Sequence, residues 1–252
     1  MPRSFPLGVL DGAALPFKAV GLIARTPRLL GLALISAVVT SGVVVLLFIT
    51  LWPLARSIAE HLVAGDGTTW SVVRTAGVVL LYVVLLVSTL LTVPHLVLAP
   101  LEDPLSEATE VSLGGFTPPP FSLGTFARGV VLSASHTLLR LVFLLGGVLV
   151  LLPLNLLPVV GSVAYAVVSF TWSAWWAASE YTAGPGARHH LGFFEVQRLL
   201  RRGSGATLGL GAVLVVLLWI PLVNFFLVPL AVVSGTLLYR GLAAPGGNAA
   251  PP

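Results

Sequence analysis

Two arginines lie just ahead of the first long apolar run of the sequence, and their chemistry suits an anion. Arg25 and Arg28 precede an uncharged run that extends from Leu29 to Leu51. A guanidinium group binds a tetrahedral oxyanion through two parallel hydrogen bonds, and the first turn of a helix presents free N–H groups. Arg25 and Arg28 are therefore a candidate anion-binding site. The alternative is that both arginines only anchor the helix at the cytoplasmic membrane surface.

A group of acidic residues follows the second long apolar run, and a group of arginines comes much later in the chain. Asp103, Glu107 and Glu110 are spaced i, i+4 and i+7, so they share one face of a helix. We expect salt bridges between the two groups, which would fix a short acidic helix against a surface helix. The acidic residues are Glu102, Asp103, Glu107 and Glu110, and the basic residues are Arg198, Arg201 and Arg202. A divalent cation is the alternative partner, but no Asp-rich loop surrounds these carboxylates, so no metal site is expected.

The residue types that most enzymes need are missing or isolated. The chain has no cysteine, which excludes disulfides, thiolate metal sites and thiol nucleophiles. His136 lies between Ser135 and Thr137, but no carboxylate is placed to orient it as in a catalytic triad. No glycine-rich nucleotide loop is present either. We therefore expect no enzymatic activity, no catalytic residue and no cofactor.

The composition is that of a protein embedded in lipid. Of the 252 residues, 57% are hydrophobic and only 9% are charged, whereas about 25% of residues are charged in soluble domains. Thirteen Lys and Arg residues against nine acidic residues give a net charge of +4. This excess suits loops that face anionic lipid headgroups and does not indicate nucleic acid. The lipid bilayer is therefore the first expected partner.

Two uncharged runs are long enough to cross a membrane. Leu29 to Leu51 and Thr75 to Ala99 each exceed the roughly 20 residues that a transmembrane helix needs. After the second run, Asp103 precedes Pro104, which predicts a helix cap and a new, short acidic helix. Two glycines at 114–115 are expected to end that helix.

Two further apolar segments have the pattern of helical hairpins with short arms. About 13 apolar residues precede Pro221 and about 10 follow Pro229, so each arm reaches roughly 15–20 Å of a hydrocarbon core of roughly 30 Å. The predicted hairpin tips are Pro153, Asn155 and Pro158 in the first hairpin and Pro221, Asn224 and Pro229 in the second. We expect the hairpins to be hemi-penetrating, which means that they enter and leave by one face. The alternative is a set of complete crossings by proline-kinked helices.

Three segments are predicted to be amphipathic surface helices, namely Ala13–Ile23, Phe121–Arg140 and Phe193–Arg202. The expected fold is thus an all-α integral membrane protein with two long transmembrane helices, two hemi-penetrating hairpins and surface helices. Residues 1–242 are expected to form a single membrane domain. Residues 243–252 are expected to be a disordered tail.

The distribution of basic residues predicts the orientation. Four Lys or Arg residues precede the first span, two lie between the spans and seven follow the second span. By the positive-inside rule, both termini are then cytoplasmic in a multi-pass protein of the bacterial inner membrane. Complete crossings would give the same sides, so this count does not separate the two hairpin models.

Three stretches of the sequence resemble one known family, the CysZ-type sulfate permeases and etoposide-induced membrane proteins. The order and spacing agree over roughly residues 15–240, and the third stretch is the most specific. The stretches are Ala99–Glu110, then Glu180-Tyr181 with Gly192–Glu195, Arg198–Arg202 and Leu208–Gly211, and finally Ile220–Thr236. The resemblance implies two long spanning helices, two hemi-penetrating hairpins and an oligomer. It also implies sulfate uptake in bacteria or an endoplasmic reticulum membrane role in eukaryotes.

One position departs from the pattern of the permease branch. That branch carries Gly-Leu-Arg just before the first spanning helix, whereas this chain has Arg25-Thr26-Pro27-Arg28. Our hypothesis is a permease or channel-like protein for sulfate or a related oxyanion, which works as a homo-oligomer. The alternative is a non-transporting scaffold or membrane-shaping protein of the same fold.

Overall fold

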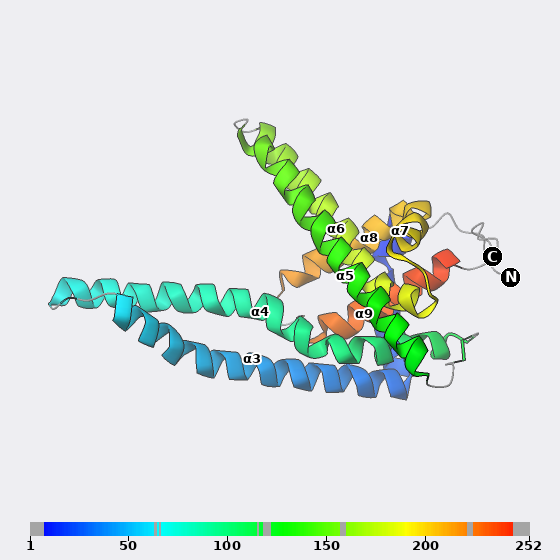
Figure 1. Cartoon of the computed structure of the whole chain (residues 1–252), viewed down its shortest axis with the longest axis horizontal. Coiled ribbons are helices and arrows are strands. Elements are labelled where there is room, and N and C mark those ends of the chain that lie inside the picture. Colours follow the sequence, from blue (N-terminus) through cyan, green and yellow to red (C-terminus); the bar gives the residue numbers. More distant parts are fainter. Residues whose placement is uncertain are drawn as a thin grey trace. The chain divides into compact units, whose positions relative to one another are not determined.

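The computed structural model describes residues 8–62, 65, 67–114, 116–117, 122–156, 160–220 and 224–243 (Figure 1). Within these residues every regular element is helical, from α1 to α9 with one short 3-10 helix, η1. The expected all-α class is therefore confirmed. The chain divides into two compact units, one of residues 34–100 and the other of residues 1–33 together with 101–252.

Several of the described helices are long and apolar enough to cross a membrane. By length and composition there are four, or five if α7 and α8 form one bent span. They include Pro27–Leu62, which is α3, and Thr68–Thr89 at the start of α4. The two long spans expected from the sequence thus correspond to α3 and α4.

The smaller unit consists of α3 from Leu34 onward and of α4 as far as Pro100. The helix α3 covers Pro27–Leu62 and α4 covers Thr68–Ser112. The rings of Trp52 and Tyr82 meet edge to face with centroids 5.2 Å apart, which joins the two helices inside this unit. Such aromatic pairs add to the stabilisation from simple burial.

The separate acidic helix expected after Asp103 is not observed, because α4 continues through Pro104 to Ser112. A proline removes one backbone donor and bends a helix, but it need not end it. Helix α4 ends at Ser112, and Gly114, two residues further on, has a φ of +77°, which suits a residue without a side chain. The expected end at Gly114-Gly115 thus lies two residues beyond the observed one, and residue 115 lies outside the described residues.

In the larger unit, α5 and α6 run side by side as a hairpin (Figure 1). They cover Leu123–Leu151 and Val160–Arg188, 29 residues each, and η1 at Leu152–Leu156 follows α5 at the tip. The indole N–H of Trp172 donates to the Leu144 carbonyl at 3.3 Å across the hairpin. The hairpin arms are therefore longer than the sequence suggested.

The surface helix expected at Phe121–Arg140 is the first part of α5 and not an element of its own. Charge at Arg140 suggested a helix end near the membrane surface. In the structure Arg140 forms a salt bridge with Glu180 on α6, so the helix carries this charge without interruption.

Helix α8 is the central element of the larger unit. It covers Ser204–Leu218, only 15 residues, and meets α7 (Phe193–Arg202) at an angle of 101°. A Cβ atom at Gly209 would overlap the backbone of Val9 in α1, and one at Gly211 would overlap the backbone of Ala174 in α6. These glycines let neighbouring backbones come unusually close, as small residues do in membrane proteins.

The remaining helices pack around α8. Helices α1 (Val9–Ala13) and α2 (Leu15–Arg25) precede α3, and α9 covers Asn224–Ala243. A Cβ atom at Gly235 of α9 would meet the backbone of Tyr181 in α6. The same close packing therefore joins α9 to α6.

The predicted hairpin tips lie in different surroundings. Pro153 and Asn155 belong to η1, where the Asn155 side-chain amide donates to the Leu152 carbonyl at 3.4 Å. Pro229 lies inside α9 and is buried, away from the turn. Asn224 begins α9. Pro158, Pro221, the side chain of Asn224 and residues 244–252 of the expected tail lie outside what the structure describes.

Candidate functional site

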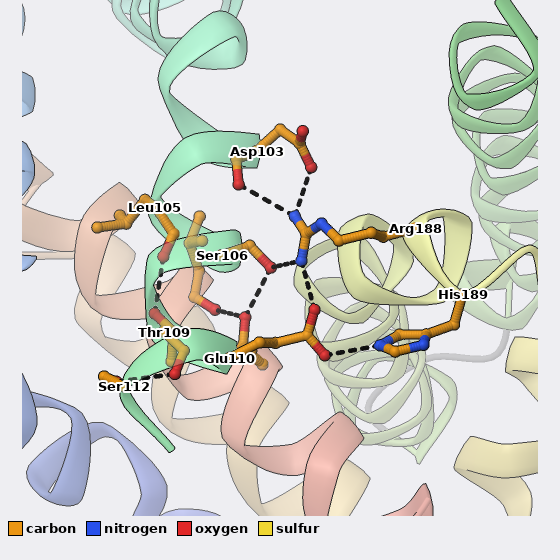
Figure 2. Close-up of polar contacts among 10 residues, drawn as sticks. Asp103, Leu105, Ser106, Thr109, Glu110, Ser112, Arg188 and His189 are labelled. Atoms are coloured by element: carbon orange, nitrogen blue, oxygen red, sulfur yellow. Dashed lines mark hydrogen bonds and ion pairs between the residues drawn. The ribbon is translucent and has the colours of Figure 1, made fainter. Parts of the chain in front are cut away.

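A buried carboxylate is the centre of the most connected polar site in the described residues (Figure 2). Glu110, in the last turns of α4, is fully buried. Arg188, the last residue of α6, donates from Nη1 to Glu110 Oε2 at 2.5 Å. The ring of His189 lies on the other side, with Nε2 2.9 Å from Oε1. Because an ionised carboxylate only accepts hydrogen bonds, this Nε2 carries the proton.

Arg188 also contacts two residues of α4 that precede Glu110 on the same side of that helix. Its Nη2 donates to a carboxylate oxygen of Asp103 at 2.5 Å and to the Asp103 backbone carbonyl at 3.0 Å. Its Nη1 lies 3.4 Å from the Ser106 hydroxyl. Asp103, Ser106, Glu110, Arg188 and His189 are called the Arg188 cluster below. Charge-assisted bonds of this kind are among the stronger hydrogen bonds in proteins.

Helix α9 closes the Arg188 cluster from a third direction. The hydroxyls of Ser106 and Thr236 lie 2.9 Å apart, and the ring of Tyr239 stacks on His189 with centroids 5.4 Å apart. Arg240 donates to the carbonyl of Gly114, just after α4 ends. The cluster therefore joins the ends of α4 and α6 to the C-terminal half of α9.

The partners of Glu110 also determine its charge. Burial raises the pKa of the Glu110 carboxyl, but the hydrogen bonds from His189 and Arg188 lower it by more, so that the pKa lies below its ordinary value. Glu110 is thus ionised at neutral pH in spite of its burial. A buried carboxylate of this kind depends on its partners, because removing one would leave an uncompensated charge.

A second charged group lies where α4, α5 and α6 meet. Arg140 Nη1 and Glu180 Oε1 are 2.7 Å apart, and both side chains are partly buried. Burial raises the pKa of the nearby Glu102 carboxyl to about 7, and the negative charge of Glu180 adds to this, while Arg140 acts in the opposite direction. Glu102 is therefore a group that exchanges its proton near neutral pH.

The two arginines of the expected anion site are close to each other but belong to neither group. Arg25 ends α2, Arg28 is the second residue of α3, and Thr26 between them is extended, with φ −113° and ψ 105°. Both arginine side chains are exposed. Among the described residues, no ion pair connects either of them to the Arg188 cluster.

The acidic residues of α4 have a partner that was not predicted. The sequence favoured Arg198, Arg201 and Arg202 of α7, whereas Asp103 and Glu110 bind Arg188. In the sequence, a proline between two glycines is typical of a loop, but α6 runs through Gly184-Pro185-Gly186 to Arg188. Glu107 of the same group is half-buried. If the helix is continued through Pro185, Arg188 falls on the same helix face as Tyr181 and Gly184. This spacing is the sequence signal that could have identified Arg188.

The Arg188 cluster is suited to holding helices together and not to binding an anion. Both Nη atoms of Arg188 already donate to carboxylates. Among the described residues, no group of three His, Asp or Glu side chains is placed to hold a metal ion. Arg25 and Arg28 are exposed and lie outside this cluster.

These features define a polytopic α-helical membrane protein in which buried charged side chains are paired with each other. A family model described as "Sulfate transporter CysZ/Etoposide-induced protein 2.4" matches residues 15–229. The chain belongs to this family, as the resemblance in its sequence indicated.

Named relatives support the same assignment. A protein of Pectobacterium atrosepticum named Sulfate transporter CysZ is 31% identical over 157 residues, which is 61% of this chain and 57% of the relative. A protein of Pseudomonas aeruginosa with the same name is 33% identical over 162 residues, 64% of this chain and 65% of the relative. The matches thus span less than two thirds of these relatives. Their names are those of transporters, in agreement with the expectation that the chain is not an enzyme.

The raised pKa of Glu102 predicts a pH-dependent stability. Because its folded pKa of about 7 exceeds the ordinary value of 4.5, the folded state binds more protons between these values, and stability falls as pH rises through that window. The slope from this one group is at most about 1.4 kcal/mol per pH unit. Glu102→Gln should remove that part of the slope in thermal unfolding of the detergent-solubilised protein between pH 5 and 8.

The matched control is Glu107→Gln on the same helix, which should keep the slope of the unaltered chain because Glu102 is still present. If Glu102→Gln and the unaltered chain show the same pH dependence, Glu102 does not titrate in this window.

Proposed function

We propose that this protein is a permease or channel-like protein for sulfate or a related oxyanion. The support is membership of a family described by sulfate transport, together with relatives named Sulfate transporter CysZ. The proposal applies the activity in those names to this chain. Sulfate is a doubly negative tetrahedral anion, so its binding site needs positively charged side chains that are not already paired with carboxylates.

The observation that carries the proposal is the placement of Arg25 and Arg28. The extended Thr26 turns the chain between α2 and α3, so that one arginine ends a helix and the other lies in the first turn of the next. The first N–H groups of a helix have no acceptor within it, and the helix dipole favours an anion there. Two exposed guanidinium groups beside such N–H groups match the charge and the hydrogen-bond acceptors of sulfate.

We also propose that the hairpins enter and leave by one membrane face. The 15 residues of α8 reach ~22 Å, less than the ~30 Å of hydrocarbon. In the first hairpin, the part of α5 beyond Arg140 reaches ~17 Å and the five residues of η1 add ~10 Å. By length alone, Ala127–Leu156 and Phe226–Ala243 are long enough to cross, so the proposal rests on the short α8 and on the charge that Arg140 places within α5.

A homo-oligomer follows from the same proposal. Most exposed side chains along the hairpin are apolar, among them Leu145, Leu149, Val163 and Val167, and the polar exceptions in its distal part, such as Ser162 and Thr171, are uncharged. An anion cannot cross along such a surface, so a path requires polar groups brought together from several copies. We further propose that both termini are cytoplasmic in a bacterial inner membrane, on the arginine counts given above.

The transport proposal predicts sulfate flux into proteoliposomes that contain the purified chain. The double variant Arg25→Gln with Arg28→Gln should lower flux by about tenfold or more, because each lost charge-assisted hydrogen bond is worth roughly 1.5–3 kcal/mol. Arg128→Gln, at an exposed arginine of α5, is the control and should leave flux unchanged.

Flux no greater than in empty vesicles would refute the permease and favour the membrane scaffold. Flux that is equal in the double variant and the unaltered chain would refute the assigned arginines but not transport. Other oxyanions added as competitors in the same assay measure the anion selectivity of a chain that carries Arg25-Thr26-Pro27-Arg28.

The topology proposal predicts the labelling of single cysteines, which the cysteine-free chain allows without background. Asn155→Cys and Asn224→Cys at the two tips should not react with a membrane-impermeant maleimide added outside intact cells. Trp70→Cys, between the two long spans, should react and is the positive control. Labelling of both tips as fast as position 70 would mean that the hairpins cross completely.

A further inference from the structure

An apolar groove lies between the α5–α6 hairpin and α7. Its volume is about 530 Å³, within the range of small-molecule sites. Aromatic side chains from three helices dominate its wall. They are Phe143 of α5, Trp172, Trp175 and Trp176 of α6, and Phe193 and Phe194 of α7.

Two of the three indole N–H groups in this wall are bonded inside the protein, and the third, that of Trp176, is buried without a hydrogen-bond partner among the described residues. The indole N–H of Trp172 donates to the Leu144 carbonyl, and that of Trp175 donates to the side-chain oxygen of Gln197 at 2.9 Å. The Gln197 amide nitrogen donates in turn to Ser179. The groove therefore presents mainly ring carbons, which favour a hydrocarbon ligand.

One positive charge stands at the edge of the groove. Arg201 of α7 lines it and is exposed, and its Nε donates only to the Gln197 carbonyl of its own helix at 3.4 Å. In the described ranges no carboxylate forms an ion pair with Arg201. Its guanidinium thus offers terminal N–H donors to an outside acceptor.

The helix that carries Arg201 has the form of a helix lying at a membrane surface. Phe193, Val196 and Leu200 are buried, whereas Arg198 and Arg201 are exposed. Such helices lie at the depth of the headgroups, with their basic face toward phosphates. A ligand with an acyl chain and a negative headgroup matches both the groove and its edge.

We propose that this groove binds an anionic phospholipid, with an acyl chain against Trp172 and the other rings and with the headgroup phosphate at Arg201. The apolar wall excludes free phosphate as the main ligand, since a free anion would leave the hydrocarbon part of the site empty. A zwitterionic phospholipid can supply the chain but carries no net negative charge for Arg201.

The test uses tryptophan fluorescence, because three of the six tryptophans line the groove. In the full chain, Trp52, Trp70 and Trp219 are replaced by Phe, and the protein is reconstituted into phosphatidylcholine vesicles with a minor fraction of phosphatidylglycerol. Bromine on the acyl chains of either lipid, at the same mole fraction, quenches tryptophans in contact with that lipid. We expect brominated phosphatidylglycerol to be enriched about fivefold at the groove relative to brominated phosphatidylcholine.

Arg201→Gln should make the two lipids equal, whereas Arg198→Gln, one turn away on the same helix, should keep the preference. Glycerol phosphate added in solution should not change the quenching. Equal quenching in the unaltered groove would overturn the proposal, and so would the same loss in both arginine variants, which would indicate general surface charge. Circular dichroism of each variant verifies that the helices are intact.

Discussion

Lipid offers no hydrogen-bonding partners, and this constraint accounts for the arrangement of charge in the larger unit. No charged residue occurs between Arg140 and Glu180, which is the whole distal part of the α5–α6 hairpin. The charged residues that border this part pair with each other, and the fully buried Glu110 is compensated by Arg188 and His189. A carboxylate left alone in such surroundings would be costly, so these pairs decide where the helix ends meet.

Close backbone packing complements the charge pairing. Charge joins α4, α6 and α9 at their polar ends, while glycines on α8 and α9 bring α1, α6 and α9 together where no polar group is available. In lipid, burial of apolar side chains gives little preference for one helix partner over another, so small residues and polar contacts have to supply it. The short α8 thereby becomes the element around which longer helices pack.

The sequence predicted the parts of this fold that depend on local composition. The long uncharged runs gave α3 and α4, and the basic residues before Leu29 led to the exposed Arg25 and Arg28. Helix continuity could not be predicted, because Pro104, Arg140 and Pro185 each resemble a helix end until their tertiary neighbours are known. Arg188 was missed for this reason. The aromatic groove was missed because its rings come from three helices, and tryptophans at the end of an apolar run are also typical of interface anchors.

The central claim is that Glu110 and Arg188 form an energetically coupled pair, and a double-mutant cycle tests it most directly. Unfolding in mixed detergent micelles would compare Glu110→Gln, Arg188→Gln and the double variant. Each single change should cost roughly 3–5 kcal/mol, and the double change should cost less than their sum by on the order of 1–3 kcal/mol. The exposed pair Arg56–Glu60 should show almost no coupling. Strict additivity at Glu110 and Arg188 would contradict the account.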